Sequence, residues 1–498
     1  MLLSLLVVLL LSCLVLYPKF SRRRSKLNLP PSPPRLPIIG NLHQIFGSDL
    51  PHHSFQALSN KYGPLMFLHL GCSPTLVVSS AKLAREVMKP HDIVFSNRPK
   101  TTAANVFLYG CKDVGFSPYG EYWRQARKTC VLGLLSIKKV QSFQYAREEE
   151  VADLVNKIRC SCLKGGSVNL TEKLLTASNN IISRCVLGRK AEDETGSSNF
   201  GELSRRLMVQ FGSFAFGDMF PCLGWLDVVT GLIGRLKATA RAFDDLFDQV
   251  IEERKTSGSD DKRDLLHVLL QFQKNGTLGI ELSEDNLKAI IMDMFVGGTE
   301  TTSTTVEWVM AELVKNPKLM KKAQEEVRNV VKSKSNVSMN DINQMDYLKC
   351  VVKETLRFHA PVPLLVPRES STSLNLRGYD IPPKTTLYIN AWAIQRDPQV
   401  WSRAEEFLPE RFMEESVDVE GQEFQFLPFG VGRRGCPGMA FGLAAAEYLV
   451  ANLLYWFDWK LPGGAVEENL DMSEVYGLTV RKRFPLVLMP TPYSSCSI

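Results

Sequence analysis

One cysteine near the C-terminus lies in a setting that suits a metal-bound sulfur. Cys436 falls within residues 429–438, which read FGVGRRGCPG. Glycine tolerates positive φ and close backbone approach, so this loop can fold tightly beneath a flat cofactor. We expect Pro437 to be the first residue of a helix, where its missing N–H costs nothing. Cys436 would then lie at a helix N-terminus, whose free N–H groups favour an anionic sulfur.

A second group of reactive side chains is expected in the middle of a long helix. Ser283 is a suitable N-cap, and helix-forming residues continue to Lys315, just before an Asn-Pro pair. Residues 297–302 read GGTETT, and paired glycines with threonines are poor helix formers. The sequence therefore predicts a weakened or bent helix there, with the Thr301 hydroxyl next to the Glu300 carboxyl.

Two residue pairs are spaced to share one face of a helix. Glu354 and Arg357 are three positions apart, and Trp123 and Arg127 are four positions apart. Taken alone, such pairs are more often solvated surface groups than parts of a site. Further along, the string PERF contains Arg411 and follows a proline-rich stretch.

These strings together resemble the cytochrome P450 family, and the similarity covers about residues 30–490. The cysteine loop resembles the haem-binding pattern F-x-x-G-x-R-x-C-x-G, and GGTETT resembles the oxygen-activation pattern of the family. The strings PPSPPRLPIIGN, PERF and FGVGRRGCPG are similar to those of plant A-type microsomal enzymes of specialised metabolism. The resemblance implies a mainly α fold with small β-sheets, in one large domain with helix-rich and β-rich lobes.

The resemblance also implies roles for individual residues. Cys436 would be the axial ligand of haem iron, where a thiolate favours cleavage of the O–O bond. Thr301 would hydrogen-bond the oxygen that is being activated, while Glu300, where many plant relatives carry Asp, would help to relay protons. Contacts to haem are expected from Arg98, Trp123, Arg127, Arg368, Phe429, Arg434 and Gly438. A buried network with a structural role is expected from Glu354, Arg357 and Arg411.

The substrate-contacting stretches of the family fall on four parts of this sequence. They are a hydrophobic segment from Thr101 to Tyr119, one face of the long helix, the stretch after Arg357, and a hairpin tip at 477–480. We expect a mostly apolar pocket lined by Phe107, Val114, Asp293, Val296, Gly297, Val362, Leu364, Leu365 and Leu478. Without the haem motif, each of these residues would be interpreted as ordinary core.

The N-terminus predicts a membrane anchor. Residues 2–16 are almost entirely apolar, and five basic residues follow within 19–26. A cleaved signal peptide carries its positive charges first, and the positive-inside rule places the following domain in the cytosol. We expect a transmembrane signal anchor at 1–17, a basic and proline-rich hinge at 18–40 and a catalytic domain at 41–498. By resemblance the chain is a single-pass protein of the endoplasmic reticulum membrane.

Composition and missing motifs narrow the range of partners. The net charge is only +6, and no basic face interleaved with aromatic residues suggests nucleic-acid binding. The 11 cysteines are scattered without zinc spacing. No Rossmann or flavin motif is present, so the resemblance implies electrons from NADPH through a separate NADPH-cytochrome P450 reductase. It likewise implies haem b (iron protoporphyrin IX) as cofactor and O2 as co-substrate.

Three functions remain open from the sequence. The first is a monooxygenase that inserts one oxygen atom from O2 into a small, largely apolar plant specialised metabolite. The second is a redox-neutral haem-thiolate enzyme such as an aldoxime dehydratase. The third is a non-catalytic haem-binding sensor, which would have no need for Thr301 or for a proton relay.

Overall fold

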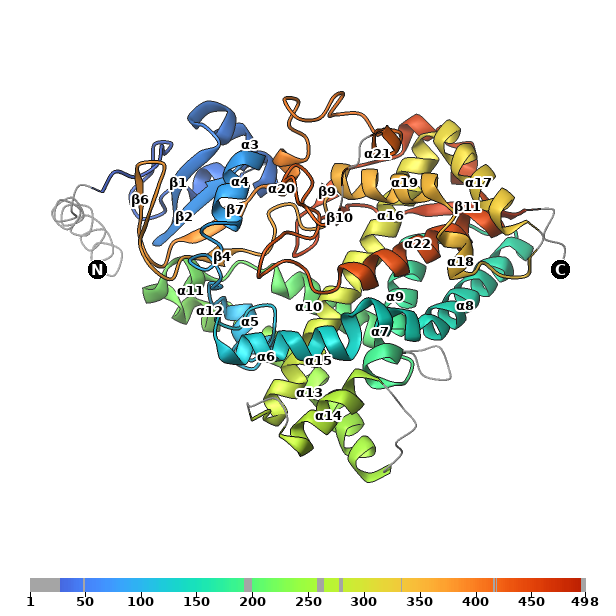
Figure 1. The fold of residues 1–498 in the computed structure, drawn as a ribbon, viewed down its shortest axis with the longest axis horizontal. Coiled ribbons are helices and arrows are strands. Elements are labelled where there is room, and N and C mark those ends of the chain that lie inside the picture. Colours follow the sequence, from blue (N-terminus) through green and yellow to red (C-terminus); the bar gives the residue numbers. More distant parts are fainter. Residues whose placement is uncertain are drawn as a thin grey trace, which may run out of the picture.

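The computed structural model describes residues 27–47, 50–191, 199–257, 264–276, 281–332, 334–414, 417 and 419–493. The predicted anchor and the basic part of the predicted hinge lie outside these described residues. Figure 1 shows a helix-rich lobe joined to a smaller lobe built on a β-sheet. The predicted mainly α architecture with small sheets is therefore confirmed.

The smaller lobe is built on a four-stranded sheet. Its strands lie in the order β1-β2-β7-β4, with bounds β1 (Leu65–Leu70), β2 (Ser73–Val78), β7 (Thr386–Ile389) and β4 (Arg368–Glu369). Strands β1 and β2 form an antiparallel hairpin, and β7 pairs in parallel with β2. The helices around this lobe are α2 (Leu42–Ile45), α3 (Pro51–Tyr62), α4 (Ala81–Met88) and α20 (Ala391–Ile394).

Three small sheets complete the β structure. Their strands are β3 (Val168–Asn169), β5 (Leu374–Leu376), β6 (Tyr379–Ile381), β8 (Phe457–Lys460), β9 (Glu474–Val475), β10 (Arg481–Lys482) and β11 (Val487–Pro492). Strand β11 pairs with both β3 and β8, while β5 pairs with β6. Antiparallel pairing of β9 with β10 confirms the hairpin tip predicted at 477–480.

Most of the remaining chain forms helices. They are α5 (Thr102–Phe107), α6 (Glu121–Cys130), α7 (Ile137–Ser142), α8 (Gln144–Leu163), α9 (Leu170–Leu187), α10 (Asn199–Phe211), α11 (Phe216–Met219), α12 (Trp225–Val229), α13 (Leu232–Ser257), α14 (Leu265–Asn275), α17 (Pro317–Val331), α18 (Met339–Ile342), α19 (Asp346–Phe358) and α21 (Arg411–Glu414). The predicted Trp123/Arg127 and Glu354/Arg357 pairs lie on α6 and α19 respectively.

The long central helix is broken where the sequence predicts weakness. Helix α15 (Glu284–Gly298) begins with a capping box in which the Ser283 and Asn286 side chains each bond the other residue's backbone N–H. Thr299 then interrupts the helix with φ −89° and ψ −71°, and α16 (Glu300–Lys315) continues beyond it. The next helix begins at Pro317, where proline's missing N–H does no harm.

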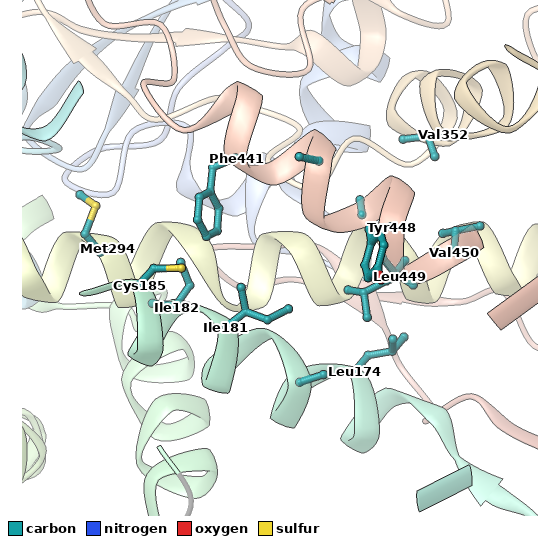
Figure 2. Packing of buried hydrophobic residues seen from close by; sticks show 14 of the residues in the cluster. Leu174, Ile181, Ile182, Cys185, Met294, Val352, Phe441, Tyr448, Leu449 and Val450 are labelled. Carbon is teal, nitrogen blue, oxygen red and sulfur yellow. The ribbon is translucent and has the colours of Figure 1, made fainter. Parts of the chain in front are cut away.

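Helix α22 (Met439–Trp456) packs beside α16 in the middle of the larger lobe. Figure 2 shows Phe441 of α22 on one side of the central helix and Ile181 and Ile182 of α9 on the other. Among the described residues, α22 is the one helix long and apolar enough to span a membrane, but most of it is buried. It is therefore the core helix of this lobe.

The prediction that Pro437 begins this helix is wrong. Pro437 and Gly438 form a turn, and the helix starts at Met439. Gly438, with φ −94° and ψ 10°, is the N-cap, and its carbonyl accepts the Gly442 N–H at 2.8 Å. The extra turn tightens the chain between Cys436 and the helix.

Candidate active site

The loop before α22 closes around Cys436. The Cys436 N–H donates to the Phe429 carbonyl at 2.8 Å. Gly430 and Gly432 have φ of 60° and 74°, in the left-handed region that favours glycine. A Cβ at Gly432 would also lie 2.7 Å from an oxygen of Asp92. The loop therefore needs glycine at these positions to hold the cysteine where it is.

The sulfur of Cys436 is accessible although protein surrounds it. The side chain is solvent-accessible, while burial of the thiol raises its pKa. The Gly438 N–H and the charge of Arg127 act in the opposite direction. An accessible sulfur deep in the protein, with an N–H and a cation beside it, suits a thiolate ligand of a bound metal.

The two adjacent glycines in the central helix have different surroundings. A Cβ at Gly298 would lie 2.3 Å from Cδ1 of Ile182, so this glycine allows α9 to pack closely. A Cβ at Gly297 would meet no atom within 4 Å, and neither would one at Gly442 on α22. Thr301 donates its hydroxyl to the Gly297 carbonyl at 2.6 Å. The Thr301 hydroxyl therefore lies beside Gly297, the glycine whose missing side chain leaves open space.

The Glu300 carboxyl is attached to the β9–β10 hairpin. It accepts a hydrogen bond from the Thr479 hydroxyl, and Nε of Arg481 lies 3.9 Å away. Burial raises the pKa of Glu300, while Thr479 and Arg481 oppose that shift. The neighbouring Val480 carbonyl accepts a hydrogen bond from the Trp308 indole at 3.3 Å, which fixes the hairpin to α16. No residue spacing indicates this long-range anchor in advance.

Four buried or half-buried arginines gather beside the cysteine loop: Arg98, Arg127, Arg368 and Arg434. Burial, followed by repulsion from Arg434 and Arg368, lowers the pKa of Arg98 well below its usual value. Burial lowers the pKa of Arg434 to about 9. The guanidinium carbons of Arg434 and Arg127 lie 4.4 and 5.5 Å from the Trp123 ring centroid. The structure thus brings together these five predicted haem contacts.

The hydrogen bonds of these arginines go mostly to carbonyl oxygens. Arg98 donates to three of them, Arg434 to another three, and Arg127 to the Gly435 carbonyl at 2.6 Å. Within the described chain, Arg368 alone among the four has an ion pair, with Asp92 at 2.8 Å. Buried cations are costly without anions. The cluster, the accessible sulfur and the open space fit a flat metal cofactor with acidic groups on its rim.

A separate buried network joins α19 to α21. Glu354 accepts two hydrogen bonds from Arg357, each 2.8 Å long, and one from Nε of Arg411 at 3.1 Å. The Leu408 N–H donates to the same carboxylate at 2.8 Å. Both members of the Glu354–Arg357 pair are fully buried. The three residues predicted to form one network therefore do meet.

Aromatic side chains from distant segments meet near the predicted pocket. Phe107 stacks on Phe211 with ring centroids 5.7 Å apart, and Phe116 lies 5.5 Å from Phe211. A Cβ at Gly212, which follows Phe211, would be 3.1 Å from the backbone nitrogen of Leu478. The sequence analysis missed Phe116 and Phe211, because only their apolar character marks them.

The carboxyl group of Asp293 is hydrogen-bonded to the segment at 114–115. Its carboxyl accepts the N–H groups of Val114 at 2.6 Å and Gly115 at 3.1 Å. Asp113, which the sequence analysis also missed, accepts the Phe116 N–H at 2.6 Å. Burial raises the pKa of Asp293 well above its usual range, and the nearby Asp113 charge adds to that effect. The two carboxyl groups therefore hold this segment against α15.

The other predicted pocket residues are divided between regions. Leu364 belongs to a small core cluster with Phe55 and Leu68, beside the four-stranded sheet. Leu365 is half-buried near the cysteine loop, where a Cβ at Gly430 would lie 3.6 Å from it. Val296 and Val362 are likewise half-buried. The structure does not bring Leu364 together with the aromatic group.

Comparison with known proteins gives consistent results. The model of the Cytochrome P450 family matches residues 30–487. Phenylacetaldehyde oxime monooxygenase of Prunus mume is 54% identical over 97% of this chain and 94% of its own length. Cytochrome P450 71A1 of Persea americana is 53% identical, covering 90% of this chain and 91% of its own. A zebra fish cytochrome P450 solved with progesterone has a TM-score of 0.79 and 28% identity, over 89% of this chain and 100% of its own.

Proposed function

Since this chain belongs to the cytochrome P450 family, we propose that it is a membrane-anchored haem-thiolate monooxygenase. It inserts one oxygen atom from O2 into a small, largely apolar plant specialised metabolite. Electrons come from NADPH through a separate reductase. The observation that carries this proposal is the accessible sulfur of Cys436 within a cation-lined, glycine-rich site.

Two groups of residues would hold haem. Cys436 would supply the sulfur ligand, in a loop shaped by Phe429 and Gly438. The arginine cluster, together with Trp123, would bind the acidic groups of the cofactor. When bound, haem supplies iron that activates dioxygen, and a thiolate ligand favours cleavage of the O–O bond.

Thr301 and Glu300 hold protons and deliver them to the site. The Thr301 hydroxyl holds a proton beside the open space at Gly297. Glu300 has a raised pKa because it is buried, so it retains a proton more readily than an exposed glutamate. Nε of Arg481, whose side chain is a third exposed, lies 3.9 Å from this carboxyl. We expect protons to enter past Arg481 to Glu300 and then to Thr301.

The substrate contacts are aromatic and aliphatic. Phe107, Phe116 and Phe211 form an aromatic group. Leu478 approaches the C-terminal end of α10, the helix that carries Phe211. Rings of this kind favour stacking with another ring. The name of the Prunus mume relative, phenylacetaldehyde oxime monooxygenase, supports a small aromatic substrate. We therefore propose a phenyl-bearing compound as the substrate class.

The outer surfaces serve the membrane and the reductase. The apolar run at 2–16 anchors the chain to the endoplasmic reticulum membrane, with the domain in the cytosol. The reductase docks on a basic face that includes Lys138, Lys139 and Arg433, of which Arg433 is also paired with Asp92 at 2.9 Å. Charge complementarity of this kind speeds encounter.

The test is the oxygen requirement of turnover. Phenylacetaldehyde oxime is the first compound to offer, together with NADPH and a plant reductase. A monooxygenase should consume it only in air and should carry label from isotopic dioxygen into the product. Full turnover without oxygen would overturn the proposal in favour of an aldoxime dehydratase. If this oxime is not consumed, a screen of phenyl-bearing compounds by the haem spectral shift selects the one to test.

A matched variant tests the role of Thr301. In Thr301→Ala, NADPH consumption should continue while product falls and hydrogen peroxide rises, because protons are no longer delivered in place. Ser303→Ala, two positions along α16 and therefore on another face of the helix, is the control and should keep its product yield per NADPH. Equal yields in both variants would remove Thr301 from the mechanism.

A further inference from the structure

A group of metal-ligand side chains lies between α3 and the β9–β10 hairpin. His52 and His53 are in the first turn of α3, and Glu474 begins β9. Nε2 of His52 and Nε2 of His53 lie 3.3 and 3.9 Å from the same Glu474 oxygen, Oε2. One ligand atom from each residue falls within 4.8 Å of the others. Two imidazoles and a carboxylate therefore converge on one point.

Several polar atoms at this point are not satisfied. The His52 side chain is fully buried. Although Nε2 of His52 lies 3.3 Å from Oε2 of Glu474, neither of these atoms, nor Nδ1 of His52, has a hydrogen bond of acceptable geometry in the part of the chain that the structure describes. Buried polar groups without partners cost free energy, and native proteins leave few of them. An ion at the convergence point would bind Nε2 of His52 and Oε2 of Glu474, and would satisfy these two atoms together.

We propose that His52, His53 and Glu474 form a binding site for a divalent transition metal, with zinc as the best match. Two histidine nitrogens and one glutamate oxygen are a donor set that zinc uses, with water as a fourth ligand. Surrounding groups support the ligands, as at known metal sites. The His52 carbonyl accepts the Asn390 side-chain N–H at 2.9 Å. The Trp392 ring packs against both imidazoles, at centroid distances of 5.3 and 4.5 Å.

Such a metal would fasten two distant parts of the chain. Helix α3 lies near the start of the domain, while β9 lies close to its end. The loop that follows β9 carries Thr479, which donates to Glu300. A metal bound only to the folded protein stabilises it by an amount that grows with the logarithm of metal concentration over Kd. Bound zinc should therefore hold the hairpin that anchors Glu300.

The experiment is zinc counting on the full-length haem-loaded protein. Equilibrium dialysis against Zn²⁺, followed by elemental analysis, should give one equivalent more for the native protein than for His53→Ala or Glu474→Gln. Either variant should bind that ion at least ten-fold more weakly. His53 is partly exposed and Gln is nearly isosteric with Glu, so both variants should fold, as an unchanged haem spectrum would show. His43→Ala, an exposed histidine, should retain the full count.

A crystal soaked in Zn²⁺ locates the ion. An anomalous peak between His52, His53 and Glu474 is the expected result. Equal zinc counts in the native protein and both variants, or peaks only at cysteines, would overturn the proposal. Cysteine binding is a real competitor, because Cys72, Cys160 and Cys222 are exposed.

Discussion

Two groups of buried arginines in this enzyme solve the same physical problem differently. In the α19–α21 network, Arg357 and Arg411 share the Glu354 carboxylate, with Arg357 completing its bonds to carbonyls such as that of Gln395 at 2.8 Å. Beside the cysteine loop, Arg98 and Arg434 donate to carbonyls alone. Both cations of the first group therefore contact a carboxylate, whereas in the second group, among the described residues, only Arg368 forms an ion pair.

The difference separates a structural network from a binding site. A buried charge without an opposite charge is costly, and here the cost appears as lowered arginine pKa values. In the first group the shared carboxylate is part of the fold itself. In the second group Asp113 acts on Arg98 and Arg434 through its charge without a hydrogen bond, so a directly bound anion for these two would come only from a ligand such as the acidic rim of haem. The same comparison gives different expectations for mutations in the two groups.

The largest effect is expected where the α19–α21 network loses its carboxylate. Replacing Glu354 with Gln leaves Arg357 and Arg411 buried without an anion, which should cost about 3–5 kcal/mol of unfolding free energy. Denaturant unfolding of the purified protein measures this loss, which is large enough to prevent haem incorporation. Arg403→Ala, which removes an exposed pair with Glu406, is the control and should leave stability nearly unchanged. Comparable stability of the two variants would contradict the structural role.

Glu307 is a buried carboxylate whose pKa is shifted by burial, as the pKa values of the arginines beside the cysteine loop are. Glu307 on α16 accepts a hydrogen bond from Thr171, with Lys482 nearby, yet burial raises its pKa to about 7. Because the folded pKa lies above the unfolded one, the folded state loses stability as pH rises through about 7. Glu307→Gln should be more stable than the native protein at pH 8–9, by at most about 3 kcal/mol, and not below pH 4. A thermal denaturation series over pH measures this; equal pH profiles would contradict it.

A smaller effect, on haem release, is expected from a change in the arginine cluster beside the cysteine loop. Arg434→Gln removes one cation from the rim of the site, so haem should leave roughly 10–100-fold faster. The unfolding free energy of the haem-free protein should not fall, because repulsion from Arg98 and Arg368 is relieved. Transfer of haem to apomyoglobin measures release, and Arg433→Gln, exposed and next in sequence, serves as the control. Faster release from the control than from Arg434→Gln would break the comparison.

The smallest effects concern the neighbouring glycines of the central helix. Gly298→Ala forces a Cβ to within 2.3 Å of Ile182, so it should lower stability by about 1–3 kcal/mol. Gly297→Ala meets open space and should leave stability equal or slightly higher, since alanine favours helix. It should instead change the haem spectral shift on ligand binding. Thermal denaturation and ligand titration of both variants test this, and the reverse pattern would contradict it.

Local order in the sequence was enough to predict much of the site. The glycine-wrapped Cys436, the break before Thr301 and the Ser283 cap depend on neighbouring residues and on backbone preferences, which a sequence displays directly. The meeting of Glu354 with Arg411 required the family resemblance, because nothing local indicates that PERF returns to α19.

Other long-range pairings could not be predicted. Glu300 is anchored to Thr479, and Phe107 stacks on Phe211, although neither pair has any spacing signal. The paired glycines look equivalent in sequence and differ only through the position of Ile182 on α9. The start of α22 was misplaced because an extra turn at Pro437 follows from the closed loop before it. In the first three cases the deciding contact joins segments that the sequence separates widely, whereas the start of α22 depends on a local turn.

The central claim is that Cys436 binds haem iron as a thiolate, and the spectrum of the reduced protein with carbon monoxide tests it most directly. The native protein should show the red-shifted Soret band of a thiolate-ligated haem. Cys436→Ala should lose that band, while Cys185→Ala, a buried cysteine on α9, should keep it. Persistence of the red-shifted band in Cys436→Ala, or its absence from the native protein, would contradict the claim.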